Sequence, residues 1–383
     1  MPIWSQELGW SRSFVSGSAA TALLVMAAIA PLAGRLVDRH GVRATLALGL
    51  SLVGVGCLIV AATSDPHVYI LGFSGLSALG FGIVATHVVS TAIARLFERH
   101  RGLATGIATS GATGGQFLIV PLIATVLATS SWRWSFLVLG IACLALILPL
   151  WWTLAATAES EQQVSPDQSS SSLQADLGAI VRKPAFHVLF WSFLLCGYTT
   201  AGVIETHFLP YASFCGFGPV PSAAAYGLLS AVNMLGMIGA GWLTDRMSRV
   251  VLLGSIYLLR GLTFVILMHV GGSYEMLVIF AALFGAVDYA TVPVTASLVA
   301  SHIGLRVMGL AMGLISAGHS MGAALGAWSG GYVFDLTMRY DGVWTISTGL
   351  AVAAGLMVLA LRDRPSPGHA TAMVAVPIGN DAQ

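Results

Sequence analysis

Charged side chains are scarce in this sequence. Asp, Glu, Lys and Arg make up only 9% of its 383 residues, against about a quarter in an average soluble domain. Hydrophobic residues account for 56%, and the mean hydropathy is +0.85. This composition excludes a water-soluble globular protein, and the lipid bilayer is the first partner that the sequence predicts.

The patterns of redox and nucleotide-driven chemistry are also missing. None of the four cysteines, Cys57, Cys143, Cys196 and Cys215, belongs to a CxxC pair, so no metal or redox centre is expected. The sequence contains no GxxxxGKS or GxxxxGKT phosphate loop, and ATP is therefore not expected as the energy source. We expect a protein that is not an enzyme, has no cofactor and binds no nucleic acid.

Long apolar stretches fill most of the chain. Each of eleven segments reaches the roughly 20 residues that a helix needs to cross the hydrocarbon core of a bilayer. Six contain no ionisable side chain and five contain a few: Phe14–Gly34, Ala44–Ser64, Gly102–Ser131, Trp134–Ala158, Val220–Thr244 and Val343–Leu361, then Val68–Ala94, Ala185–Ala212, Val250–Gly271, Met276–Ser301 and Val307–Phe334. The sequence therefore predicts an all-α membrane protein with eleven spans.

Basic residues predict the orientation of these spans. With the loops placed alternately, only Arg12, Arg133 and Arg339 fall on one side, and the other side holds Arg35, Arg39, Arg43, Arg95, Arg99, Arg101, Arg182, Lys183, Arg246, Arg249, Arg306, Arg362 and Arg364. By the positive-inside rule the basic side is cytoplasmic. We expect a multi-pass protein of the cell membrane, the inner membrane of a bacterium, with its C-terminus in the cytoplasm.

The two halves of the chain repeat each other. A shift of 207 residues (241 − 34) places Gly34, Leu36, Asp38 and Arg39 on Gly241, Leu243, Asp245 and Arg246 without a gap. The same shift places Gly102, Leu103, Ala104 and Gly106 on Gly309, Leu310, Ala311 and Gly313. A tandem repeat of half-chain size is typical of membrane transporters.

The repeat indicates that a first helix is missing. The counterpart of Ala185–Ala212, the first span of the second half, would lie almost wholly upstream of Met1. We infer an absent first helix; the alternative is a genuine eleven-span protein with an outward N-terminus. Residues 1–156 then form a bundle of helices 2–6, and residues 185–362 form a bundle of helices 7–12.

Polar segments separate and follow the two bundles. Residues 157–184 are acidic and serine-rich and are predicted to be a cytoplasmic linker. Its end has the helical apolar spacing of Leu173, Leu177, Ile180 and Val181 and is expected to lie along the membrane face as a short amphipathic helix. Residues 363–383 contain three prolines and no apolar period, so we expect a disordered tail.

The loop after the first span carries the most specific motif. Residues 34–43 read GRLVDRHGVR, and residues 241–246 read GWLTDR, with Ser248 where the turn glycine would be. In this motif the chain resembles the major facilitator superfamily, and the resemblance covers the whole chain apart from the absent helix. Five shorter runs make it most similar to bacterial members related to the monocarboxylate transporters: GWSRS at 9–13, RGLATGIA at 101–108, THxxP at 206–210, TVPVT at 291–295 and GHSMGAALGAWSGG at 318–331.

The resemblance implies two six-helix bundles and a gate on the cytoplasmic side. Asp38 is expected near the start of helix 11, around Arg306–Gly309, where free N–H groups and the positive end of the helix dipole favour a carboxylate. Asp245 is expected at the start of helix 5; the alternative for both is a solvated charge. The expected gate comprises Gly34, Asp38, Arg39, Gly41, Arg43, Gly241, Asp245 and Arg246.

Ionisable residues near the middle of the membrane are the candidates for the substrate and proton pathway. Asp288 lies five residues before Pro293, which interrupts the helix, and it is expected to bind substrate, to carry a proton or to make a structural hydrogen bond. His319 is expected to titrate or to act as a packing donor.

Six further residues complete the candidates. Glu205 and His207 lie on different faces of helix 7, and burial would suit Glu205 to carry a proton. Arg260 is expected to bind an anionic substrate or to pair with Asp288 or Glu205. The other polar candidates in the spans are Asn233, Gln116 and His87.

These observations together predict a secondary active transporter. It would move a small solute by alternating access, an organic acid anion coupled to protons, and it would be a monomer. Two alternatives stay open at this stage: a proton antiporter that exports a neutral or cationic drug-like compound, and a sensor with a transporter fold that moves nothing.

Overall fold

The structure, a computed structural model, describes Trp4 and residues 7–97, 99–154 and 172–362. Every regular element in this part of the chain is helical, and nine of its helices are long and apolar enough to cross a membrane. The predicted class, an all-α multi-pass membrane protein, is confirmed, whereas the number of eleven spans stays a prediction. Most of the predicted linker, the predicted tail and the side chain of Gln116 lie outside the described residues.

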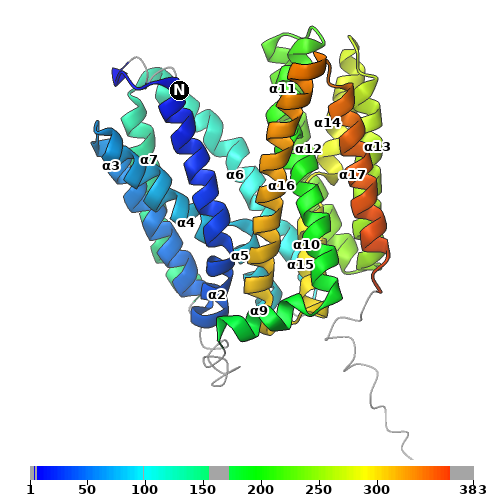
Figure 1. Ribbon diagram of the computed structural model, residues 1–383. Helices are drawn as coiled ribbons and strands as arrows, with labels where there is room; N and C mark the ends of the chain where they lie inside the picture. The colour runs from blue at the N-terminus through cyan, green and yellow to red at the C-terminus, as the bar shows by residue number, and fades with distance from the viewer. Residues whose placement is uncertain (1–3, 5–6, 98, 155–171, 363–383) are drawn as a thin grey trace, which may run out of the picture.

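The helices form two groups that meet at one end (Figure 1). The first group contains α2 (Arg12–Ala62), α3 (Pro66–Ile70), the π-helix η1 (Leu71–Ser77), α4 (Ala78–Ile83), α5 (Thr86–Leu96), α6 (Arg101–Thr129) and α7 (Trp132–Thr153). The second contains α10 (Pro184–Gly197), the π-helix η3 (Tyr198–Gly202), α11 (Ile204–Phe214), α12 (Pro219–Thr244), α13 (Arg249–Met268), α14 (Tyr274–Val287), α15 (Thr291–His302), the 3₁₀ turn η4 (Leu305–Val307), α16 (Met308–Thr337) and α17 (Asp341–Leu359). Between them α9 (Leu173–Val181) crosses the lower end.

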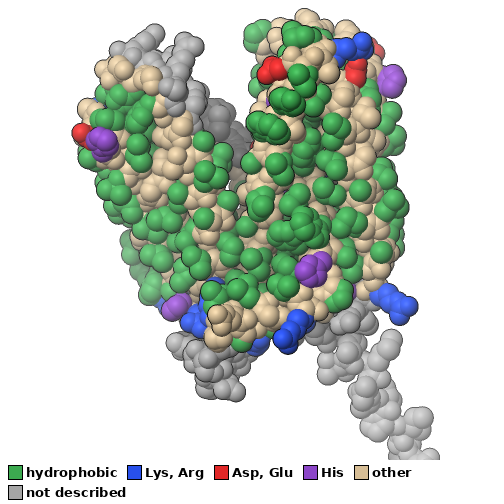
Figure 2. Space-filling view, viewed as in Figure 1, with side chains coloured by type: hydrophobic (Ala, Val, Ile, Leu, Met, Phe, Trp, Pro, Cys, Tyr) green, Lys and Arg blue, Asp and Glu red, His purple; other side chains and the backbone are tan. Residues whose placement is uncertain are grey.

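The lower end is also the basic end of the molecule. Figure 2 shows Lys and Arg side chains gathered there, and it shows the two groups parted at the opposite end. The basic end is therefore closed, and the cleft between the groups opens away from it.

Two predicted spans are joined in α2 by a single residue. Gly41, at φ 77° and ψ 171°, is the non-helical residue inside Arg12–Ala62. This left-handed φ is open to glycine and strained for residues with a Cβ, so the glycine of the motif lets the chain reverse direction here. In the second copy of the motif, Ser248 stands outside the helices as the N-cap of α13, and α12 and α13 are separate.

Glycines bring the two groups into backbone contact near the basic end. A Cβ on Gly34 would lie 1.9 Å from the carbonyl oxygen of Gly309, and one on Gly309 would lie 2.1 Å from that of Gly34. The repeat makes the same crossing a second time: a Cβ on Gly241 would lie 2.4 Å from the carbonyl oxygen of Gly102, and one on Gly102 would lie 2.5 Å from that of Gly241. Small residues permit such close helix packing in membranes, so α2 meets α16 and α6 meets α12 at equivalent points.

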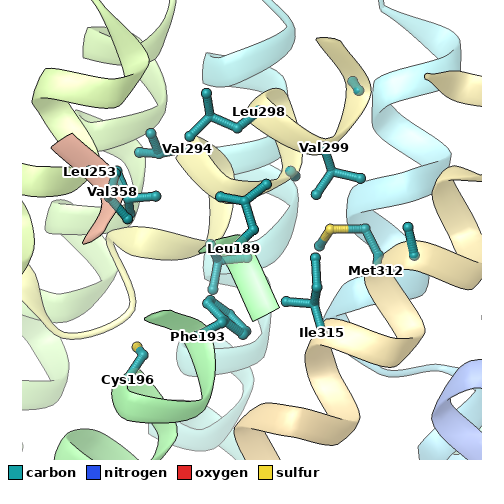
Figure 3. Packing of buried hydrophobic residues seen from close by; sticks show 14 of the residues in the cluster. Leu189, Phe193, Cys196, Leu253, Val294, Leu298, Val299, Met312, Ile315 and Val358 are labelled. Atoms are coloured by element: carbon teal, nitrogen blue, oxygen red, sulfur yellow. The ribbon is translucent and has the colours of Figure 1, made fainter. Parts of the chain in front are cut away.

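The largest buried apolar cluster holds the second group together and anchors α9 to it. Figure 3 shows its centre, where Leu189 and Phe193 of α10 lie near Ile315 of α16. Ile180 of α9 is fully buried in this cluster, and Leu177 packs against it. The linker helix predicted from the apolar spacing is thus present, and its apolar face covers the second group of helices.

Replacing Gly34 by alanine should force α2 and α16 apart. The added methyl group would collide with the Gly309 backbone, and overpacking of this kind costs about 1–3 kcal/mol. We expect Gly34→Ala to lower the melting temperature of the purified protein by several degrees. Gly17→Ala is the matched control in the same helix, because a Cβ there meets no atom within 4 Å. Equal melting temperatures for the two variants would contradict this account of the crossing.

Candidate functional site

Asp38 caps the start of α16 from the other group of helices. Its carboxylate accepts hydrogen bonds from the backbone N–H groups of Gly309, at 2.9 Å, and Leu310, at 2.8 Å. Arg95 of α5 forms an ion pair with Asp38 and also donates to the carbonyl oxygen of Leu305, at 3.2 Å. The placement expected from the sequence is therefore seen, with the charge of Asp38 at the positive end of the helix dipole.

Asp245 makes the equivalent contacts at the start of α6. Its carboxylate accepts hydrogen bonds from the N–H groups of Gly102, at 2.8 Å, and Leu103, at 2.9 Å. Among the described residues it forms no ion pair like that of Asp38 with Arg95.

The first arginine of the motif to be placed is Arg43, whose guanidinium group stacks 3.7 Å over the ring of Trp151.

The remaining arginines of the motif lie at its edge. Arg246 stacks 3.9 Å over the ring of Trp242, and Arg39 is exposed. The motif thus supplies carboxylates for the helix starts and arginines for the surrounding surface.

Asp176 adds a third contact at the basic end, which the sequence reasoning missed. It lies in α9, is only 7% exposed, and pairs with Arg306 at 2.9 Å and Arg35 at 3.5 Å. Arg35 belongs to α2 and Arg306 to η4, so one carboxylate links both groups of helices. The signal available in the sequence was an acid four residues before Ile180, on the apolar face of the linker helix.

The membrane helix that contains Asp288 is broken at this residue. α14 ends at Val287, Asp288 has the non-helical ψ of −82°, and α15 begins at Thr291. Asn233 of α12 supports the break, because its side chain donates to the Asp288 carboxylate, at 3.3 Å, and accepts from the Tyr289 N–H, at 3.2 Å. Asp288 is 4% exposed, and its Oδ1 atom has no hydrogen-bond partner.

Arg260 contacts the backbone of this break and not the carboxylates proposed for it. Its Nη2 donates to the carbonyl oxygens of Val287, at 2.6 Å, and Asp288, and its Nη1 donates to the sulfur of Cys196, at 3.0 Å. Among the described residues no ion pair joins Arg260 to the carboxylate of Asp288 or Glu205, so the expected contact with Asp288 is made through its backbone carbonyl group. Because Arg260 is 0% exposed, it also does not present its charge to a substrate in this state.

Glu205 and His319 lie at the edge of the cluster. Glu205 is exposed, which corrects the expectation of a buried proton carrier, and it accepts a hydrogen bond of 2.8 Å from the hydroxyl group of Tyr289. His319 of α16 is half-buried, with Nε2 3.4 Å from the Thr200 hydroxyl oxygen. Its ring centroid is 6.2 Å from that of Tyr289.

Two other histidine candidates are packing residues in this structure. His207 is buried, with Nε2 3.0 Å from the carbonyl oxygen of Ala327 and its ring against Gly330. His87 is 2% exposed within the first group of helices, and neither of its ring nitrogens has a hydrogen-bond partner among the described residues. Neither lies with the Asp288 cluster.

The structure therefore gathers five of the predicted residues around one broken helix. Asp288, Asn233, Arg260, Glu205 and His319 come from five different segments of the second half. Tyr289 and Cys196 join them, and sequence reasoning had missed both. A buried carboxylate beside an interrupted helix and an exposed acid is chemically able to take up and release a proton.

Comparison with known proteins agrees with this architecture. The family model of the Major Facilitator Superfamily matches residues 1–273 and 235–374. The chain belongs to this superfamily. It is 26% identical over 335 residues to the MFS-type transporter YcxA of Bacillus subtilis, covering 86% of this chain and 81% of that protein. It is 27% identical over 351 residues to monocarboxylate transporter 12 of Rattus norvegicus, covering 83% and 71%.

Solved structures of transporters share the fold. The human organic anion transporter MFSD10 superposes with a TM-score of 0.69 at 18% identity, covering 93% of this chain and 87% of that one. The fucose transporter FucP in its outward conformation superposes with a TM-score of 0.68 at 18% identity, covering 94% and 92%. The superfamily and the resemblance to monocarboxylate transporters predicted from the motifs are thus confirmed.

Asp38 should stabilise the closed basic end more than Asp245. Both cap a helix start, an interaction of about 0.3–2 kcal/mol, but Asp38 also balances the charge of Arg95. We expect Asp38→Asn to lower the melting temperature of the purified protein more than Asp245→Asn. Asp341→Asn, which removes an exposed pair with Arg339, is the control and should have little effect. A larger fall in melting temperature for Asp245→Asn than for Asp38→Asn would show that the ion pair with Arg95 adds nothing to the stability of the closed basic end.

Asp176 should be energetically coupled to Arg35 across the two groups of helices. Asp176→Asn and Arg35→Gln each remove the same ion pair, so their combined effect on melting temperature should be smaller than the sum of the single effects. The cycle of Asp176 with Arg133, which lies at the opposite end and donates to the Ala61 carbonyl, is the control. Strict additivity of Asp176 and Arg35 would leave α9 without a role in joining the groups.

Proposed function

We propose that this protein is a proton-coupled secondary transporter of a small organic acid anion. The proposal rests on the environment of Asp288. Its carboxylate is buried in a helix break, and one of its oxygen atoms has no hydrogen-bond partner. A buried charge at membrane depth is costly, so a carboxylate in this position favours the protonated, neutral form. Release of the proton restores the buried charge and raises the free energy of this state. The cleft gives solute access from one side while the basic end is closed.

The substrate class rests on the relatives and on His319. The relatives at 83–86% coverage of this chain include a monocarboxylate transporter, and a solved structure with the same fold is an organic anion transporter. With Arg260 fully buried, His319 is the basic side chain of the cluster that retains exposure, and we assign it to the anionic group of the substrate.

The exposed carboxylate of Glu205 favours a second candidate function. A negative charge near the cleft would attract a cationic solute and would repel an anion unless it were protonated. An antiporter that exchanges a neutral or cationic drug-like compound for protons is therefore the alternative, and its substrate would bind near Glu205 and Tyr289.

The contacts at the basic end support a gate in this proposal. Asp38, Asp245 and Asp176 each join a helix of one group to an element of the other. By the positive-inside rule this end faces the cytoplasm, and the three contacts would break when the carrier opens inward.

Transport assays in liposomes test the proton role of Asp288. Asp288→Asn should reduce uptake of labelled carboxylates driven by a pH gradient by at least about tenfold, because it removes the proton-binding group. Exchange of labelled for unlabelled substrate should persist, since exchange requires no net proton movement.

A panel of solutes separates the two functions. Saturable uptake of small carboxylates by the wild-type protein supports transport of an organic acid. Uptake of lipophilic cations, if Glu205→Gln abolishes it, supports the antiporter. Asp335→Asn, an exposed acid outside the cluster, is the matched control. Normal gradient-driven uptake by a folded Asp288→Asn protein would refute the proton role, and absence of flux for every solute would point to a sensor.

A further inference from the structure

The break in the Asp288 helix creates a place for a cation inside the membrane. Where α14 ends, its last carbonyl groups lose their usual helix partners, and the negative end of the helix dipole faces the break. The Asp288 carboxylate adds a full negative charge, and its Oδ1 atom is buried without a hydrogen-bond partner. In membrane transporters, freed carbonyls and helix C-termini of this kind coordinate sodium ions or protons.

In this protein an arginine side chain reaches that place from a neighbouring helix. The guanidinium of Arg260, on α13, binds the carbonyl oxygens of Val287 and Asp288 through one nitrogen. Its other terminal nitrogen donates to the sulfur of Cys196, and the guanidinium carbon Cζ lies 5.4 Å from the ring centre of Tyr257. These contacts and full burial keep the charge of Arg260 at the break.

We infer that Arg260 is a tethered cation that fills the cation position of the helix break and so restricts Asp288 to protons. A sodium ion needs several oxygen ligands at once, and two of the carbonyl oxygens available here are already bound by the guanidinium. A proton needs only the free oxygen of Asp288. The inference deepens the proposed function, on which it rests, by naming the residue that selects the coupling ion.

Removing the side chain of Arg260 should therefore open a cation site. The Arg260→Ala variant keeps the backbone carbonyl groups of the break, the Asp288 carboxylate and a cavity of guanidinium shape. It lacks the positive charge that balances Asp288, and an uncompensated buried charge destabilises a protein strongly. A small cation that enters the cavity would restore the balance, and it would stabilise the folded protein by mass action.

The test is the melting temperature of purified protein in detergent with choline, sodium or guanidinium chloride at equal, non-denaturing concentrations. Wild type should melt at the same temperature in choline and in sodium, and the small loss that guanidinium causes as a denaturant in wild type is the reference for the variants. Arg260→Ala should melt lower in choline, and guanidinium and sodium should each recover part of the loss. The recovery should disappear in the double variant Arg260→Ala, Asp288→Asn, because the negative charge that attracts the cation is gone.

Arg249→Ala is the matched control. Arg249 is buried on the same helix, but it donates to the carbonyl oxygen of Ser297 within the intact helix α15. Its loss should lower the melting temperature without a response to sodium. Equal melting of Arg260→Ala in the three salts, or stabilisation of wild type by sodium, would overturn the inference.

Two further measurements keep the test decisive. If Arg260→Ala does not fold, Arg260→Gln retains donors for the carbonyl groups without the charge and is examined in the same salts, with the same outcomes deciding. Because melting needs no substrate, a wild-type protein that fails to transport carboxylates would refute the proposed function while the salt response of the Arg260 variants still decides the tethered cation.

Discussion

Backbone polar groups that are buried in a folded protein have no water to bind, and the functional parts of this protein depend on how charged side chains satisfy them. At two helix starts the free N–H groups bind the carboxylates of Asp38 and Asp245. At one helix break the free carbonyl groups bind the guanidinium of Arg260. In each case the charge comes from a different helix, so a local defect in hydrogen bonding becomes a contact between helices.

The repeat sets these contacts, and its departures from symmetry distinguish the halves. The glycine crossings and the aspartate caps follow the shift of 207 residues in both directions. Arg95 has no such counterpart, because the equivalent position is His302, which binds the carbonyl oxygen of Arg362 at 2.9 Å. The Asp38 side of the basic end therefore carries an additional ion pair, and with Asp176 it forms the more strongly charged part of the closed interface.

The sequence predicted best where a residue's role follows from its immediate neighbours. Asp38 lies in a motif whose partner, a helix start, is itself visible in the sequence, and the expected contact is seen. The break at Asp288 was foreseeable from Pro293. Arg260 was harder, because the direction of a long side chain depends on the packing of three helices, and its acceptors were backbone atoms that no sequence pattern marks.

The sequence also did not predict which of these side chains are exposed. Glu205 and His207 are two residues apart, and only the structure shows that His207 is buried and Glu205 is not. The spacing of Asp176 from Ile180 places it on the apolar face of the linker helix, but its two arginine partners lie in α2 and η4, far away in the sequence, and only the structure shows that they meet it.

The π-helix η3 determines what the residues after it face. Each residue of an α-helix turns the chain by about 100°, and a π-turn accommodates an additional residue without ending the helix. η3 lies just before Ile204, and its glycine, Gly202, packs directly on the backbone of Ala323. The additional residue therefore sets the rotation of all of α11, and its deletion would turn Glu205 away from Tyr289 while leaving the sequence of every contacting residue unchanged. In this protein the composition of the site depends on a count of residues as well as on their identity.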